Sequence, residues 1–306
     1  MKLGRISVAT IAVGVALGLA ACGGGASTAS GGTVKIGIKF DQPGLGLKSG
    51  ADYTGMDVDL AKYLAKELSL GTPEFVEAVS AQRETLIQTD QVKFIVGTYS
   101  ITDARKEKVS FAGPYFIAGQ DLLVRADDNS ITGVESLNGK KLCSVKGSTS
   151  AANVQKAVPG VNLQEYGTYT LCVDALKAKN VDALTTDDTI LAGYAAQEAN
   201  KGLMKVVGKT FSKESYGVGL KKGDTAFCQK VTDAINKYVS SGEWQKAVDK
   251  NLGPAGYKAG AGNPPTPWEA FSFVSYAAAT PCAGARYVRY MDEYSLWVGA
   301  VLCTPN

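Results

Sequence analysis

Apolar residues recur with two different periods along the globular part of the chain. In the segment TVKIGIKF (33–40) every second residue is apolar, which predicts a β-strand with one buried face. In the segment MDVDLAKYLAKEL (56–68) apolar residues recur every three or four positions, and this pattern predicts a helix that is ended by Gly71. The globular part therefore begins with a strand and an amphipathic helix.

Strand and helix signals keep alternating after this first pair. Further strands are predicted near Phe75 and in VKFIVG, KKLCSV, NLQEY, VDALTT, LMKVVG and SYGVGLKKGD, and further helices in SAQRETLIQ, TSAANVQKAV, TLCVDALKAKN, DTILAGYAAQEAN, TAFCQKVTDAINKYVS and EWQKAVDKNLG. Such alternation is typical of an α/β fold in which parallel sheets are covered by helices on both faces. The extended polar segments 121–128 and 212–217 bound a middle block, as in a chain that crosses twice between two lobes.

The start of the chain has the composition of an export signal followed by a tether. Two basic residues precede an uncharged apolar run of about 14 residues, which is too short to span a bilayer as a helix. The following LAAC resembles the lipobox of bacterial lipoproteins, so we expect residues 1–21 to be removed and Cys22 to be lipidated. A plain signal peptide with an incidental cysteine is the alternative. Residues 22–32 would then tether the protein to the extracytoplasmic face of the cell membrane.

Composition narrows the chemistry that this chain can perform. The 306 residues include 32 Lys and Arg against 29 Asp and Glu, a balance that argues against a nucleic-acid partner. The chain has no histidine, which excludes Ser-His-Asp and Cys-His catalysis and removes the commonest metal ligand. It also has no CxxC, P-loop or GxGxxG motif. The sequence therefore predicts neither a metal site nor a cofactor.

Seven segments, in order along the chain, carry a family resemblance. They are VKIGIKFDQPGLG, YTGMDVDLAKYLAKEL, AQRETLIQ, GTYSITDARKEKVSFAGPYF, LNGKKLCSVKGSTSA, VDALTTDDTILAGYA and YGVGLKKGD. Over about residues 33–257 the chain resembles the polar amino-acid solute-binding proteins of ABC importers, and most of all the glutamate-binding lipoproteins of actinobacteria. The resemblance implies a type II periplasmic-binding-protein-like α/β fold, with two hinge strands and a ligand cleft between the lobes. It places the first lobe at 33–120 and 217–257 and the second at 121–216.

The resemblance also implies a function. The protein would capture free glutamate, or aspartate, and deliver it as a monomer to the membrane subunits of an ABC permease, without catalysing a reaction. One alternative is an extracytoplasmic, dehydratase-like enzyme on the same fold, for which only carboxylates, tyrosine and lysine remain as acids and bases. The other alternative is the ectodomain of a sensor or an adhesin.

The charged run DARKEK lies just beyond a predicted strand, where ligands bind in open α/β sheets. By resemblance, Arg105 grips the α-carboxylate of the ligand, and a planar guanidinium suits this task because it can donate two parallel hydrogen bonds. The alternative for such a run is a solvated helix face, which remains the interpretation for Lys106 and Lys108. Thr98 and Ser100 would supply further donors to the same ligand.

Two residues of the second lobe are expected to complete the site for the α-amino-acid group. Thr149 opens a helix after a glycine turn, and its amide would reach the α-carboxylate, although Ser148 or Ser150 could simply cap this helix. By resemblance, Asp187 binds the ligand ammonium, with a pure capping role as the alternative. Asp188 is interpreted as a favourable charge in the first turn of the next helix.

The residues that bind the ligand side chain decide between glutamate and glutamine. Lys39, at the carboxyl end of the first strand, favours a γ-carboxylate, because glutamine- and histidine-binding relatives carry an acidic residue near this position. Arg83 is the second available cation. Both could instead be surface charges, and a shift of the alignment by one or two residues would put Asp41 or Gln42 in the place of Lys39.

Five cysteines remain besides the predicted lipidation site, and outside the cytoplasm pairing is expected. By resemblance, Cys143 and Cys172 both fall in the second lobe, one on a strand and one on a helix, and they form the best pair. Cys228 would then need Cys282 or Cys303, which leaves one thiol over.

The C-terminal segment 258–306 does not fit the rest of the chain. Its last part is rich in aromatic residues but has no clear helical or strand period, and the family offers no counterpart. We interpret it as a disordered or non-native extension.

Overall fold

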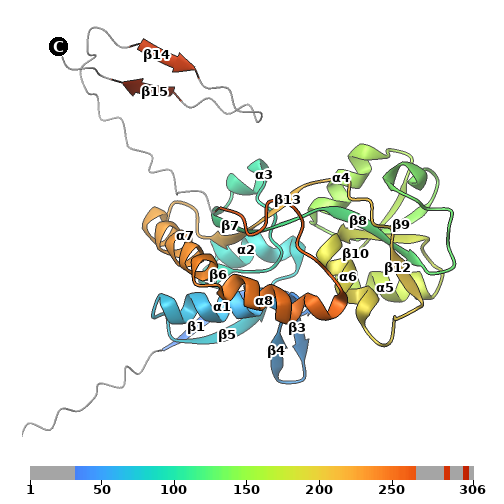
Figure 1. Ribbon diagram of the computed structural model, residues 1–306, viewed down its shortest axis with the longest axis horizontal. Helices are drawn as coiled ribbons and strands as arrows, with labels where there is room; N and C mark the ends of the chain where they lie inside the picture. Colours follow the sequence, from blue (N-terminus) through green and yellow to red (C-terminus); the bar gives the residue numbers. More distant parts are fainter. Residues whose placement is uncertain (1–31, 267–285, 290–298, 303–306) are drawn as a thin grey trace, which may run out of the picture.

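The computed structural model describes residues 32–266, 286–289 and 299–302. Its main body consists of two five-stranded sheets with helices packed around each (Figure 1). We call the sheet that contains β1, together with its helices, the first lobe, and the other sheet with its helices the second lobe.

The first lobe has the strand order β5-β1-β6-β13-β7. Its strands are β1 (Thr33–Ile38), β5 (Thr72–Glu77), β6 (Phe94–Ile95), β7 (Ser110–Ala118) and β13 (Glu214–Leu220). Its helices are α1 (Met56–Glu67), α2 (Arg83–Gln88), α3 (Asp103–Lys106), α7 (Thr225–Ser240) and α8 (Glu243–Asn251), with short 3-10 helices η1 (Ser80–Gln82) and η3 (Gly253–Ala255). A small antiparallel sheet precedes α1 and contains β2 (Asp41–Gln42), β3 (Gly46–Ser49) and β4 (Asp52–Thr54).

The second lobe has the strand order β10-β9-β11-β8-β12. Its strands are β8 (Gln120–Arg125), β9 (Lys141–Val145), β10 (Asn162–Tyr166), β11 (Ala183–Asp187) and β12 (Met204–Val206). Its helices are η2 (Val134–Leu137), α4 (Thr149–Ala157), α5 (Tyr169–Lys177) and α6 (Asp188–Ala196).

The predicted parallel arrangement holds for only part of each sheet, because both sheets are mixed. Strand β1 runs parallel to β5 and β6, and β9 runs parallel to β10 and β11. In contrast, β13 is antiparallel to β6 and β7, and β8 is antiparallel to β11 and β12. The exceptions are β8 and β13, the strands by which the chain enters each sheet after crossing from the other lobe, and they run opposite to the other strands of that sheet.

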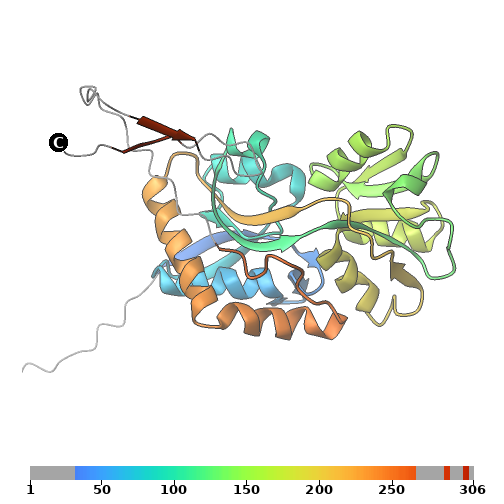
Figure 2. The same ribbon diagram turned by 45° about the horizontal axis from the view of Figure 1, so that its top comes forward.

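Two segments connect the lobes. Strand β7 of the first sheet continues into β8 of the second through Gly119, and the chain returns between β12 and β13. Strands β7 and β13 pair from Glu214 opposite Ala118 onward, so the two crossings begin side by side. Figure 2 shows both of them running between the lobes.

Helix α1 shows how the amphipathic pattern becomes a buried face. Its apolar residues Met56, Val58, Leu60, Ala61, Leu64 and Ala65 are all buried. Burying one large apolar side chain of this kind contributes roughly 1.5–3 kcal/mol, so the stripe holds the helix on the lobe. The turn into the helix needs glycine, because Gly55 has a φ of 122° and a Cβ there would lie 2.0 Å from the carbonyl oxygen of Leu45.

Some elements differ from the sequence prediction. The strand predicted in VKFIVG is reduced to Phe94–Ile95, and β2, β3, β4 and β7 were not predicted. The small sheet consists mostly of polar and glycine residues, so it lacks the alternation that marks a half-buried strand.

The second lobe contains a disulfide between Cys143 on β9 and Cys172 on α5, with a Cα–Cα distance of 5.6 Å. Cys228 is a half-buried free thiol. The predicted lipidation site Cys22 and both candidate partners of Cys228, which are Cys282 and Cys303, lie outside the described residues.

The described body continues past residue 257. Asn263 accepts a hydrogen bond from the amide of Ile117 at 2.9 Å and donates one to its carbonyl oxygen at 2.7 Å, which ties this segment to β7. Two short antiparallel strands, β14 (Arg286–Arg289) and β15 (Gly299–Leu302), lie in the segment where the sequence predicted no strand. Within the described ranges, no helix has both the length and the apolar character needed to cross a membrane.

Candidate functional site

The carboxyl ends of the parallel strands of both lobes meet in one place. In the first lobe Lys39 follows β1, Ser80 follows β5 and Thr98 follows β6. In the second lobe the turn at Gly147 follows β9, and Asp187 is the last residue of β11. Ligands of open α/β sheets bind beyond such strand ends, so this junction is the candidate site.

Arg105 is a buried bridge between the two lobes. Its side chain is only 8% exposed, whereas Lys106 and Lys108 are exposed, so a solvated helix face is the wrong interpretation for Arg105 and the right one for its neighbours. One guanidinium nitrogen, Nη1, donates to the carbonyl oxygen of Ser100 at 2.7 Å. The other, Nη2, donates to the carbonyl oxygen of Gly147 in the second lobe at 3.0 Å.

Thr98 and Ser100 line the same junction and are also buried. Thr98 has a φ of 45°, which is uncommon for a residue with a side chain, and its amide donates to a carboxylate oxygen of Asp57 at 2.9 Å. Its hydroxyl donates to the amide oxygen of Gln42 at 3.1 Å. The Ser100 hydroxyl lies 3.4 Å from that of Thr149, across the boundary between the lobes.

Lys39 and Arg83 are buried cations, so the alternative of surface charges is wrong for both. Each is 2% exposed, and among the described residues no carboxylate oxygen lies within 4 Å of either charged group. Lys39 donates to the hydroxyl of Ser80 at 3.1 Å. Arg83 donates to the carbonyl oxygen of Gly97 at 3.1 Å, while its Nε has no partner.

The electrostatics of these cations favour an anion between them. Burial, followed by the nearby charge of Arg83, lowers the pKa of Lys39 to about 8. Burial, followed by the charge of Arg105, lowers the pKa of Arg83 to about 10. Buried cations destabilise one another, and a carboxylate bound beside them would raise the pKa values of both Lys39 and Arg83 again.

Asp187 is a buried carboxyl group on the side of the second lobe. It occupies the position before α6, but its carboxylate makes no capping hydrogen bond, so the pure capping role is wrong. One oxygen, Oδ2, accepts from the hydroxyl of Tyr216 at 2.6 Å, and the other, Oδ1, is buried without a partner. Burial, followed by the charge of Glu214, raises the pKa of Asp187 well above its usual range. A ligand ammonium beside the free oxygen would relieve this cost.

Asp188 does more than place a charge in the first turn of α6. Its Oδ1 accepts from the amide of Thr189 at 2.8 Å and from that of Gly119 at 3.3 Å, which lies at the crossing between the lobes. The other oxygen accepts from the hydroxyl of Tyr257 at 3.2 Å. Asp188 therefore ties α6 to the first crossing.

Thr149 connects the start of α4 to both crossings. Ser148 caps the helix by accepting from the amide of Ala151 at 3.1 Å, so the cap does not involve the Thr149 side chain. The Thr149 hydroxyl donates to Glu214 on β13 at 3.0 Å and accepts from Gln120 on β8 at 3.0 Å. This places a helix N-terminus, which favours anions, at the junction.

Sequence reasoning missed two buried residues behind the site and weighed a third only as an alternative. Asp57 accepts from the Thr98 amide and, at 2.8 Å, from the hydroxyl of Tyr115, and burial raises its pKa to about 6. Tyr216 orients Asp187, as described above. Gln42 appeared only as a possible replacement for Lys39. The sequence has no signal that separates Asp57 from its neighbour Asp59, since both stand in the first turn of α1.

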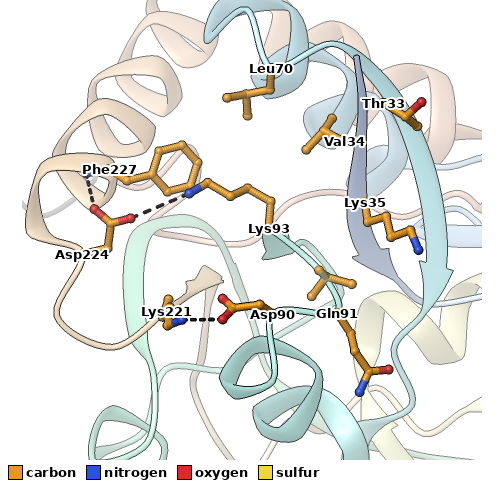
Figure 3. Close-up of a pocket in the computed structure, with 11 residues that line it drawn as sticks. Thr33, Val34, Lys35, Leu70, Asp90, Gln91, Lys93, Lys221, Asp224 and Phe227 are labelled. Atoms are coloured by element: carbon orange, nitrogen blue, oxygen red, sulfur yellow. Dashed lines mark hydrogen bonds and ion pairs between the residues drawn. The ribbon is translucent and has the colours of Figure 1, made fainter.

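A cavity of about 480 Å³ lies at the opposite end of the first sheet (Figure 3). It lies at the start of β1, and its lining includes Lys35, Lys93 and Lys221. Its charges largely pair with each other: Lys221 with Asp90, and Lys93 with Asp224 at 3.8 Å. It faces the amino ends of the parallel strands and is separate from the candidate site.

Comparison with known proteins assigns the family. Residues 34–254 match the bacterial extracellular solute-binding proteins, family 3. The chain belongs to this family. It is 44% identical over 271 residues to the glutamate-binding protein GluB of Corynebacterium glutamicum. This alignment covers 82% of the present chain and 90% of GluB. It is 40% identical over 208 residues to the glutamine-binding protein of Geobacillus stearothermophilus, covering 66% of this chain and 78% of the relative.

Solved structures agree with the family assignment. The fold superposes on an ancestral arginine-binding protein bound to arginine with a TM-score of 0.68 at 32% sequence identity. The match covers 72% of this chain and 98% of the other. The two-lobed, type II fold expected from the resemblance is therefore confirmed for this solute-binding protein.

The assembled groups are suited to binding a small zwitterion with an additional negative charge. They comprise three buried basic side chains from the first lobe and the buried carboxyl group of Asp187 from the second, while two further buried carboxyl groups, Asp57 and Glu214, are held by Tyr115 and Thr149. In the described part of the chain, no group of three or more Cys, Asp and Glu side chains is arranged to hold a metal ion.

Proposed function

We propose that this solute-binding protein captures glutamate, or aspartate, outside the cytoplasm and delivers it to an ABC importer. The observation that carries the proposal is the combination of two buried cations without a carboxylate partner, Lys39 and Arg83, and one buried carboxylate, Asp187, with an unpartnered oxygen. An acidic amino acid carries the complementary charges: two carboxylates and one ammonium.

Each end of such a ligand has its own set of residues. Arg105 has five N–H donors and keeps a second hydrogen on each Nη, so it can hold the α-carboxylate together with Ser100, Thr98 and the amide of Thr149. Asp187 would accept from the ammonium. Lys39 and Arg83 would take the side-chain carboxylate, which a neutral amide could not replace without leaving both cations unpaired.

The named ligands of the relatives support an acidic or an amide side chain, since one is called glutamate-binding and the other glutamine-binding. The buried lysine and arginine favour the acidic member of this pair. Binding, rather than dehydratase-like catalysis, fits a chain without histidine and relatives that are described as binding proteins. The partners would be the membrane subunits of an amino-acid ABC permease, and the protein would act as a monomer.

A thermal-shift screen of all free amino acids tests the proposal. A ligand that binds only the native state at 100 times its Kd adds about 2.7 kcal/mol of stability, which for a chain of this size raises Tm by roughly 5–10 °C. We expect glutamate and aspartate to give the largest shifts, glutamine a smaller one, and arginine and lysine none. A largest shift with a basic amino acid would contradict the assignment.

The location of the protein is part of the proposal. The family is extracellular by description, and the LAAC sequence at residues 19–22 supports attachment to the outer face of the cell membrane through a lipid on Cys22. Several acyl chains on one residue give stable anchoring, because each buried CH₂ contributes about 0.8 kcal/mol.

Replacing Cys22 with serine should remove this anchor. The variant is expected in the soluble fraction or as uncleaved precursor, whereas the wild type partitions with membranes and, after metabolic labelling, carries a labelled fatty acid. Cell fractionation in an actinobacterial host measures the outcome. A cleaved Cys22→Ser protein that stays as membrane-bound as the wild type would contradict lipid anchoring, without affecting the proposed ligand.

A further inference from the structure

Gln42 has a polar side chain that is buried in the junction between the lobes. It lies on β2, three residues after Lys39, and its side chain is fully buried. Its amide nitrogen Nε2 has no hydrogen-bond partner. A buried donor without a partner is costly, so most such groups in folded proteins are satisfied by protein, water or ligand.

A chain of hydrogen bonds occupies the oxygen of the Gln42 amide and leaves its nitrogen without a partner. Asp57 holds the backbone amide of Thr98 at 2.9 Å, in the left-handed conformation described above. The Thr98 hydroxyl then donates to the Gln42 oxygen at 3.1 Å. Because this contact uses the oxygen, the NH₂ group is the free end.

Gln42 shares its neighbourhood with both unpaired cations. Arg83 donates to the carbonyl oxygen of Gly97 at 3.1 Å and approaches that of Thr98 at 3.5 Å, the residue that holds Gln42. A Cβ on Gly97 would lie 3.4 Å from the side chain of Lys39. The Arg83 guanidinium and the Gln42 amide therefore lie at the turn of residues 97–98, and the stem of Lys39 passes the same turn before its ammonium reaches Ser80. Asp187 is held by Tyr216 elsewhere in the junction.

We infer that Gln42 is a further specificity-determining residue, whose free NH₂ donates to the side-chain carboxylate of the ligand beside Lys39 and Arg83. This inference rests on the proposed function and deepens it. Lys39 and Arg83 supply charge, which acts over several ångströms, whereas the amide supplies a short directional bond to one oxygen. Together these three side chains select a ligand whose side chain ends in a carboxylate and is long enough to reach them while its ammonium lies at Asp187.

Two substitutions test the inference in calorimetric titrations with glutamate and glutamine. Gln42→Leu removes the donor at similar volume and should weaken glutamate binding about 10- to 100-fold, as expected for a lost hydrogen bond to a charged group. Gln42→Glu replaces the NH₂ with a negative oxygen, which would pair with Lys39 and Arg83. It should lower the ratio of glutamate to glutamine affinity at least tenfold, roughly the effect of losing one such contact.

The ratio separates recognition from a merely structural role. A variant that only disturbs Thr98 would weaken both ligands alike, so an unchanged ratio in Gln42→Glu overturns the inference, as does Gln42→Leu binding glutamate within twofold of wild type. Gln155→Leu, at an exposed position on α4, is the matched control and should bind normally. If the wild type itself binds neither glutamate nor aspartate, the proposed function fails, and this outcome is distinct from failure at Gln42 alone.

Discussion

Replacing Arg105 with alanine should abolish measurable binding of glutamate. Loss of one partner from a buried, hydrogen-bonded charge pair typically costs about 2–5 kcal/mol, or roughly 30- to several-thousand-fold in affinity. Two losses combine in this variant. The α-carboxylate would be left without its guanidinium, and the bond from Arg105 to the Gly147 carbonyl, which joins the lobes, would disappear.

The neighbours of Arg105 supply matched controls. Lys106→Ala and Lys108→Ala remove charges from exposed positions of the same run and should bind glutamate almost normally. Arg105→Lys keeps the charge but cannot donate the paired hydrogen bonds, so it should also bind poorly. Calorimetric titration compares all four variants. If Arg105→Ala binds within about threefold of the wild type, the α-carboxylate is held elsewhere.

Replacing Gly193 with alanine should block closure of the lobes without touching the ligand. Gly193 lies inside α6 of the second lobe, and a Cβ there would be 2.2 Å from the carbonyl oxygen of Pro43 in the first lobe. The Pro43 carbonyl belongs to the backbone, so it cannot rotate away from the new methyl group as a flexible side chain could. The lobes would have to separate by about 1 Å, and overpacking of this kind typically costs about 1–3 kcal/mol.

The effects of Gly193→Ala on affinity and on stability should have opposite signs. Glutamate affinity should fall about 5- to 150-fold, because the closed, binding-competent state becomes less populated. The ligand-free protein should unfold at the same temperature or slightly higher, because alanine favours a helix interior over glycine by about 0.5–1 kcal/mol.

The contact at Gly193 is part of a wider set that joins the lobes. The neighbouring Tyr194 donates its hydroxyl to the backbone carbonyl of Asp41, and the Asp41 carboxylate accepts from the amide of Tyr169 at 2.8 Å. Gly167→Ala is the control, because nothing lies within 4 Å of its added methyl group. Unchanged glutamate affinity in Gly193→Ala would show that binding does not require this closed arrangement.

Much of the fold could be predicted from local sequence patterns. The helices α1, α4, α5, α7 and α8 follow from periods of three to four residues, and β1 follows from a period of two. Strands β9 and β11 follow from short segments that alternate with the helices. The shortness of β6 and the antiparallel direction of β8 and β13 could not be predicted, because strand pairing joins segments that are far apart in sequence.

Only part of the candidate site could be predicted from the sequence. Arg105 and Asp187 could be named because they stand near predicted strand ends, where α/β sheets bind ligands, and because the family resemblance implies a ligand-binding role for both. Gln42 and Asp57 stand in segments whose local pattern has no ligand signal, and the alternatives for Lys39 and Arg83 could not be separated. The difference between a surface charge and a buried one depends on what covers it.

The amino-acid sequence by itself determined the alternating elements, the absence of histidine chemistry and the kinds of charge available, because these depend on residues near one another or on composition. Only the tertiary structure decided which of these charges are buried at the candidate site. Lys39, Arg83 and Arg105 became desolvated while Lys106 and Lys108 stayed in water, because strand ends dozens of residues apart meet under a second lobe. Burial is a property of that meeting, and it makes these charged side chains a candidate binding site.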